Sequence, residues 1–165
     1  SINLIILTLL LLLLLNIFNI LMLGDSGAYL LGFFIGLIII SSHISNPDIS
    51  PYFFISLIWY PCFENLFSIL RKLNREFSPL KPDSKHLHQL VFFFLTKKFD
   101  LKLILSNNLS SGIICFFNFL IIHISTLNPG STIFQVKLIA TSIILYIVSY
   151  MLLFKFYKSS LIFKK

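Results

Sequence analysis

The stretch Ile133–Phe154, IFQVKLIATSIILYIVSYMLLF, decides the fold class of this chain. It is almost continuously apolar, and it is long enough for a helix that crosses the hydrocarbon core of a bilayer, which takes about 20 residues. The whole chain has the same character, since it is 57% hydrophobic and 12% charged, with a mean hydropathy of +0.93. A soluble domain carries about 25% charged residues. The composition therefore indicates an integral membrane protein.

Other apolar blocks precede this stretch, and the links between them contain Gly, Pro, Asn and Asp. These residues favour turns between spans. We predict an all-α fold, a polytopic transmembrane helix bundle of about five spans that forms a single membrane-embedded domain over residues 1–165. The predicted spans are residues 2–23, 28–44, 51–70, 109–127 and 133–154, with polar loops at 24–27 and 71–108 on one side.

The basic residues gather in two segments. All but one of the 13 Lys and Arg residues lie in the segment 71–108 or in the tail after Phe154, and Lys137 is the exception. Two predicted spans separate these segments, so both lie on the same side, and the positive-inside rule makes that side cytoplasmic. The intervening spans bring the link 24–27 to this side as well.

The link Gly24-Asp25-Ser26-Gly27 combines an acid with glycines just before a predicted helix. Glycine lets the backbone approach a ligand closely, and a helix N-terminus attracts anions. Asp25 is therefore a candidate ligand for Mg²⁺, which prefers carboxylate and phosphate oxygens. The alternative is a turn in which Asp25 or Ser26 caps the helix.

The long loop contains the run FSPLKPDSKHLHQ, residues 77–89, in which two prolines precede a group of polar side chains. Asp83, Lys85, His86 and His88 could contact phosphate or sugar oxygens, and histidine transfers protons near neutral pH. A zinc site is poorly supported, because His-x-His lacks further ligands. The alternative is a solvated loop whose positive charge marks topology beside anionic lipid headgroups.

Glu64 is an acid inside the predicted span 51–70, where a charge is costly and indicates a role. Pro61 lies one turn before it and can kink the helix. Two interpretations stay open. Glu64 either pairs with a polar group on a neighbouring helix or helps to shape a site near the end of the span.

Taken in order, these motifs resemble those of the polyprenyl-phosphate N-acetylhexosamine-1-phosphate transferases, also called glycosyltransferase family 4. The resemblance covers roughly residues 16–90 by motif and the whole chain by the layout of its spans. The residues that carry it are Gly24-Asp25-Ser26-Gly27-Ala28 with Gly32, Pro61-x-Phe63-Glu64, Arg71-Lys72, Ser78-Pro79 and Pro82-Asp83-x-x-His86-Leu87-His88.

The resemblance implies transfer of an N-acetylhexosamine 1-phosphate from a UDP-sugar to a polyprenyl (undecaprenyl) phosphate, which starts a lipid-linked glycan of the cell envelope. It implies Mg²⁺, or alternatively Mn²⁺, bound by Asp25, with Asp25, His86 and His88 as catalytic residues. Residues expected to bind substrate are Gly24, Ser26, Gly27, Arg71, Lys72, Asp83 and Lys85. The expected location is a bacterial inner membrane with the active face cytoplasmic. A homodimer is compatible with the resemblance, and nucleic acid is not an expected partner.

The sequence also departs from the family. Gln89 stands where many members have another histidine, and Ser84-Lys85 stand where an arginine is common. The family's upstream spans and their paired aspartates are missing. We therefore expect the C-terminal part of a roughly ten-span fold, inactive on its own.

Two other functions stay open. One is a catalytically dead, truncated remnant or a membrane assembly protein, which the sequence upstream of Ser1 would distinguish. The other is a transporter or channel, which would carry several intramembrane charges. Only Glu64 and Lys137 qualify, so this class ranks last. The motifs do not specify the sugar.

Overall fold

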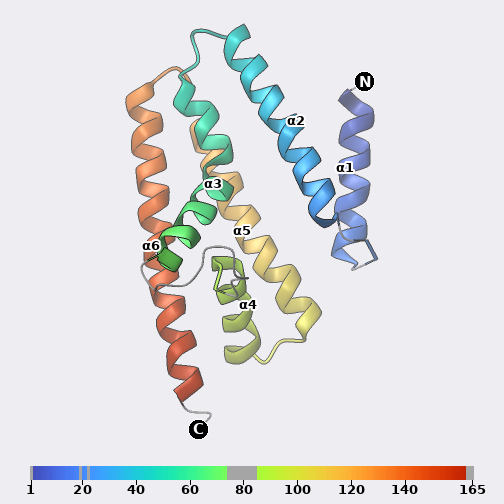
Figure 1. The fold of residues 1–165 in the computed structure, drawn as a ribbon, viewed down its shortest axis with the longest axis vertical. Coiled ribbons are helices and arrows are strands. Elements are labelled where there is room, and N and C mark those ends of the chain that lie inside the picture. The colour runs from blue at the N-terminus through green and yellow to red at the C-terminus, as the bar shows by residue number, and fades with distance from the viewer. Residues whose placement is uncertain (1, 19, 22, 74–84, 163–165) are drawn as a thin grey trace. The chain divides into compact units, whose positions relative to one another are not determined.

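The computed structural model describes residues 2–18, 20–21, 23–73 and 85–162. This part of the chain is helical and contains no strand (Figure 1), which confirms the predicted all-α class. By length and composition, α2, α3, α5 and α6 can each cross a membrane, so the chain is a multi-pass helical membrane protein. It divides into two compact units, Ser1–Pro47 and Asp48–Lys165.

In the first unit, α1 (Ile2–Ile17) is shorter than the predicted span 2–23. Its 16 residues fall short of a bilayer crossing, which takes about 20. The Leu15 carbonyl accepts hydrogen bonds from the backbone N–H groups of Ile20 (2.9 Å) and Leu21 (3.4 Å), a pattern that closes the end of a helix. The apolar composition continues past this point, so composition overestimates the length of the helix.

The second helix of this unit, α2 (Gly24–Ser45), includes the link 24–27 that was predicted as a loop. Gly24 has a φ of +68°, in the left-handed region, and Asp25 lies in the first turn, where the helix dipole favours an acid. Leu23 occupies the N-cap position, and no side chain of the described residues caps the helix. The predicted capping role of Asp25 or Ser26 is therefore wrong.

In the second unit, α3 (Pro51–Leu73) runs through Pro61 and extends past the predicted end at residue 70. The proline has no N–H for the helix ladder and its ring crowds the preceding turn, so it bends a helix. α3 changes direction part-way along its length (Figure 1). The bend redirects the half of α3 that carries Glu64.

The predicted loop 71–108 contains more helix than expected. α4 (Leu87–Lys98) lies within it, α3 continues to Leu73, and α5 (Leu103–Ser125) begins ahead of the predicted span 109–127. α4 forms because its apolar run, residues 90–95, packs against both α5 and α6. Residues 74–84 lie outside the described residues.

The last helix, α6 (Thr132–Ile162), is longer than the predicted span 133–154. The sequence after Phe154 contains no Pro or Gly that would end a helix. With 31 residues, α6 is about 46 Å long, whereas the hydrocarbon core is about 30 Å thick. One end of α6 therefore extends beyond the hydrocarbon, and α4 packs along α6.

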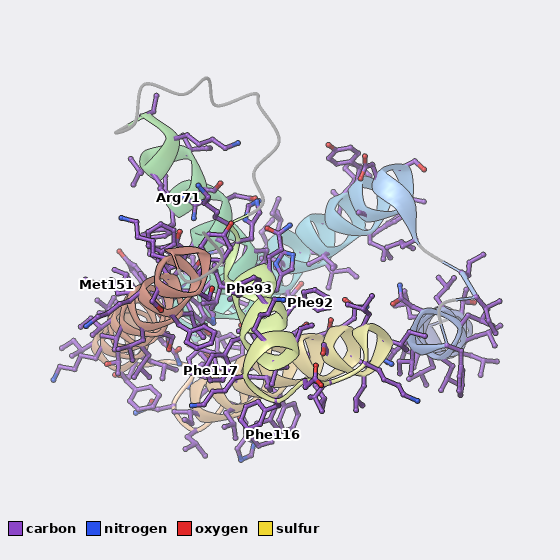
Figure 2. All side chains as sticks on the ribbon, turned by 90° about the horizontal axis from the view of Figure 1, so that it is seen from below. Arg71, Phe92, Phe93, Phe116, Phe117 and Met151 are labelled. Atoms are coloured by element: carbon purple, nitrogen blue, oxygen red, sulfur yellow. The ribbon has the colours of Figure 1, made fainter. Side chains whose placement is uncertain are left out.

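The helices of the second unit pack around an aromatic core. Its most buried members come from all four helices and are Trp59, Leu87, Leu90, Ile121, Tyr146 and Tyr150. Phe117 turns inward, with its ring centroid 6.1 Å from that of Trp59, whereas its neighbour Phe116 is 63% exposed (Figure 2). Outward-facing apolar side chains of this kind suit contact with lipid rather than water.

A buried polar network joins α3, α5 and α6 near the turn between α5 and α6. The hydroxyls of Ser56 and Ser125 lie 2.6 Å apart, and the Ser125 hydroxyl donates to Gln135 Oε1 (2.8 Å). Gln135 Nε2 donates in turn to the carbonyls of Ser125 (2.9 Å) and Asn128 (3.0 Å). Hydrogen bonds between helices hold membrane bundles together. This network therefore fixes the charge-poor end of the unit.

Candidate functional site

The predicted catalytic histidines lie where α4 begins. His86 is the N-cap residue with extended backbone (φ −70°, ψ 155°), and its N–H donates to Gln89 Oε1 (3.1 Å). His88 lies in the first turn, and its ring stacks near that of His86, with centroids 5.7 Å apart and an interplanar angle of 13°. Gln89, which departs from the family pattern, thus helps to start the helix that carries both histidines.

Glu64 ties this helix start to α3. The residue is only 8% exposed, and its Oε1 accepts a hydrogen bond from the Leu87 backbone N–H (3.0 Å). The same oxygen lies 3.1 Å from His86 Nδ1. The first of the two interpretations left open by the sequence is therefore confirmed, since Glu64 pairs with a polar group, which is the candidate catalytic residue His86.

These residues line a shallow, open pocket of about 290 Å³, called here the polar pocket after its Glu, Asn and His side chains. One wall is a face of α3 and the other is the start of α4. The lining residues are Tyr60, Pro61, Glu64, Asn65, His86 and His88. The α3 residues recur at helical spacing and so share one face. The pocket brings together two imidazole rings and a buried acid.

Arg71, in the last turn of α3, fixes the chain beside this pocket. Its Nη1 donates to the Lys85 carbonyl (2.6 Å) and to the Tyr150 hydroxyl (2.5 Å). The guanidinium also lies over the Tyr150 ring, 5.3 Å from its centroid. Such contacts stabilise a half-buried guanidinium through its charge and its planar shape. Arg71 therefore connects α3, the segment that leads into α4, and α6.

The protonation of His88 reflects its surroundings. Burial of part of the ring lowers the pKa of His88 below the ordinary value of 6.5. The Glu64 carboxylate raises this pKa to a smaller extent, and His86 lowers it. His88 therefore stays neutral to lower pH than an ordinary surface histidine.

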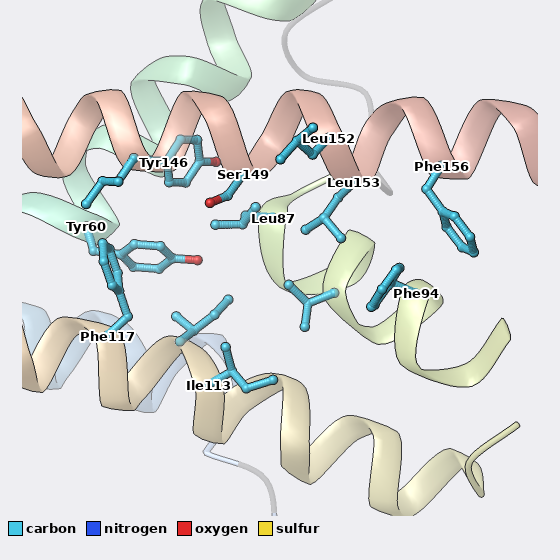
Figure 3. A pocket seen from close by; sticks show the side chains of 13 residues that line it. Tyr60, Leu87, Phe94, Ile113, Phe117, Tyr146, Ser149, Leu152, Leu153 and Phe156 are labelled. Carbon is cyan, nitrogen blue, oxygen red and sulfur yellow. The ribbon is translucent and has the colours of Figure 1, made fainter. Parts of the chain in front are cut away.

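An apolar cavity of about 470 Å³ lies among α3, α4, α5 and α6 (Figure 3). Its walls are mainly aliphatic and aromatic side chains, such as Leu87, Phe94, Ile113 and Leu153. Tyr60 lines both this cavity and the polar pocket. Tyr60 thus lies at the boundary between the polar pocket and the apolar cavity.

The boundary between the compartments contains buried polar atoms. The rings of Tyr60 and Tyr146 have centroids 6.1 Å apart, and both hydroxyls are buried. Neither hydroxyl makes a hydrogen bond of good geometry with the described residues, and the same holds for Glu64 Oε2. Sequence reasoning missed both tyrosines. The available signal was the spacing of Tyr60 and Glu64, which places them one turn apart on α3.

The candidate metal ligand Asp25 lies in the first unit, exposed in the first turn of α2. Mg²⁺ is often bound by one or two carboxylates together with phosphate oxygens and waters. Asp25 alone could supply one such carboxylate. Within the described part of the chain, no group of three or more His, Cys, Asp or Glu side chains could hold a metal ion.

The remaining predicted site residues divide between the two units. Gly24, Ser26 and Gly27 lie with Asp25 in the first turn of α2. Arg71, Lys72, Lys85, His86 and His88 lie in the second unit, at the end of α3 and the start of α4. Asp83 lies outside the described residues.

Compared with known proteins, the chain matches no family model, no curated protein and no solved structure.

Proposed function

We propose that this chain contributes to an enzyme that transfers an N-acetylhexosamine 1-phosphate from a UDP-sugar to a polyprenyl phosphate at the cytoplasmic face of a bacterial inner membrane. The observation that carries the proposal is the pocket in which His86 and His88 meet the buried Glu64. Proton transfer and phosphate binding both need such groups near neutral pH. The ordered motifs described above agree with this activity.

The reaction is a phosphoryl transfer. An oxygen of the polyprenyl phosphate attacks the β-phosphorus of the UDP-sugar, the bond from that phosphorus to the bridging oxygen breaks, and UMP leaves. Catalysis of this kind depends on positioning and on neutralising charge. His86 would hold or move a proton at the nucleotide-sugar, and Lys85 and Lys72 would attract the diphosphate. When bound by Asp25, Mg²⁺ supplies charge neutralisation to the diphosphate.

The apolar cavity supports the lipid half of the proposal. Its volume of about 470 Å³ lies in the range of ligand sites, about 300–1,000 Å³. Because Tyr60 borders both compartments, a lipid chain in the cavity would place its phosphate toward the histidine pocket. An acceptor that is polar at one end and apolar along its length matches this arrangement.

The test is an assay of membranes that contain the protein, with undecaprenyl phosphate and a panel of UDP-N-acetylhexosamines, and with release of UMP as the readout. The variants His86→Ala and His88→Ala should insert normally and lose activity by about 10²-fold or more. Asp25→Asn should abolish the Mg²⁺-dependent turnover. His123→Ala is the matched control, since this exposed histidine lies in the last turn of α5.

Two results would contradict the proposal. One is the absence of UMP release with every sugar of the panel, which is the result that an inactive membrane assembly protein would give. The other is an unchanged rate in the His86→Ala and His88→Ala variants, which would return the pocket to a purely structural role.

A further inference from the structure

Glu64 is the buried acid that the proposed transfer does not itself use. It is 8% exposed and lies within α3, where an unpaired carboxylate would be costly. Its Oε1 accepts the Leu87 N–H and lies within hydrogen-bond distance of His86 Nδ1. These contacts join one carboxylate oxygen to both the backbone and the side chain at the start of α4.

The chemistry of the carboxylate fixes the state of the ring. An ionised carboxylate only accepts hydrogen bonds, so its contact with His86 requires the proton on Nδ1. The Gln89 backbone N–H, which the capping box brings to the same side chain, favours a lone pair there instead. Where the Glu64 contact prevails, Nδ1 carries the proton. In the neutral ring, Nε2 is then the nitrogen with the free lone pair. Nε2 lies on the far side of the ring from Nδ1, and His86 lines the polar pocket. The ring therefore offers a base, rather than a second N–H, away from Glu64.

We propose that Glu64 is a positioning residue, which selects the Nδ1–H tautomer of His86 and holds its ring at the polar pocket while it fixes the start of α4. The relevance of this role to sugar-phosphate transfer rests on the function proposed above. The tautomer itself does not depend on that function. Glu64 acts on the reaction through His86 and is not required to touch the substrate.

Gln89 provides a comparison within the same helix start. Its Oε1 accepts the His86 backbone N–H at 3.1 Å, so it also supports the first turn of α4. A loss of Gln89 therefore weakens the helix start without removing the acceptor at Nδ1. A purely structural role of Glu64 predicts that both losses have the same effect on the His86 ring, whereas the positioning role predicts that they differ.

The test is ¹⁵N NMR of the histidine-labelled chain at a pH of about 8.5, above the ordinary histidine range. The His86 signals are identified by their loss in His86→Gln. The wild type should show the Nδ1–H tautomer. Glu64→Gln keeps an acceptor oxygen of the same size and should keep this tautomer, while Glu64→Met removes the acceptor and should shift His86 toward Nε2–H. Gln89→Ala should leave the tautomer unchanged.

The proposal is overturned if wild-type His86 is in the Nε2–H form, a result that needs no variant to fold. It is also overturned if Glu64→Met keeps the wild-type pattern, or if Gln89→Ala changes it as much as Glu64→Met. In the transfer assay, Glu64→Met should lose about ten- to hundredfold in rate, the effect of removing a group that orients a functional histidine, and Glu64→Gln should recover most of it.

The two proposals fail separately. A wild-type protein that releases no UMP, yet shows an Nδ1–H tautomer that depends on Glu64, would contradict the function and support the positioning. A protein that transfers the sugar phosphate with a tautomer independent of Glu64 would support the function and contradict the positioning role.

Discussion

Glu64 shows how far a single residue can be interpreted before the fold is known. The cost of an acid within a span predicted that it had a partner. The identity of the partner did not follow, because His86 lies 22 residues away and meets Glu64 only through the docking of α4. Its neighbour on the same helix, Tyr60, was predictable in principle from helical spacing on α3. Contacts within one helix follow from sequence, and contacts between helices do not.

At the same scale, His88 gives a prediction about pH. Its pKa is lowered in the folded protein, chiefly by burial. The unfolded chain therefore binds this proton at higher pH than the folded chain does, so stability is fully present above 6.5 and falls as the pH drops below it. We expect the unfolding temperature in detergent to decrease between pH 7.5 and pH 5, and His88→Gln to flatten this decrease.

His123→Gln is the control for the pH experiment, because His123 is exposed at the end of α5 and is remote in sequence from the pocket. Its loss should leave the pH dependence unchanged. An identical slope in the wild type and in His88→Gln would show that His88 does not contribute to the effect.

At the scale of elements, the start of α2 depends on Gly24. Its φ of +68° is strained for a residue with a Cβ. Gly24→Ala should therefore destabilise the chain by about 1–2 kcal/mol. Gly36→Ala is the matched change, because a Cβ there would meet no heavy atom within 4 Å. It should stabilise α2 by about 1 kcal/mol.

Thermal unfolding of the two variants, followed by circular dichroism, measures this difference. Equal effects of the two substitutions, in either direction, would show that the backbone at Gly24 does not need glycine. The result also bears on the candidate Mg²⁺ ligand, because Gly24 directs the turn that presents Asp25.

The sequence predicted which long helices are present more reliably than it predicted where they begin and end. The apolar blocks predicted α2, α3, α5 and α6, since bilayer-length helices have a strong compositional signal. α4 was missed because its 12 residues are too few to cross a bilayer and lie in a basic segment. Its stability comes from packing against α5 and α6 rather than from local pattern. The end of α1 was missed because backbone hydrogen bonds, not composition, close that helix.

At the scale of the whole molecule, the charge pattern predicts the orientation of the second unit. The turn that contains Asn128 should be external, and Lys102, before α5, should be cytoplasmic. The natural Cys62 and Cys115 are exposed and would first be replaced by serine. An impermeant thiol reagent applied to intact cells should then label Asn128→Cys, and should label Lys102→Cys only after the cells are permeabilised. The opposite pattern would reverse the orientation and move the histidine pocket outside.

The relation between the two units marks the limit of what the sequence predicts for the site. The motifs alone predict that Asp25 and the histidines serve one reaction. The contacts that describe the pocket all lie within the second unit, on α3 and α4. The packing of the helices therefore supports the grouping of His86 and His88 with Glu64. The candidate metal ligand Asp25 rests on the sequence motif alone.

The length of α6 has a consequence for the choice of membrane. Hydrophobic mismatch is relieved by tilting, by local thinning of the bilayer or by flanking lysines that reach the interface. Lys155 and Lys158 lie on α6 just past its apolar stretch, and Lys158 lies 5.6 Å above the Phe154 ring. These lysines mark the position of the membrane–water interface on a helix that continues beyond it. Because α4 is docked along α6, the fold fixes the position of the histidines relative to Lys155 and Lys158, whatever the thickness of the bilayer.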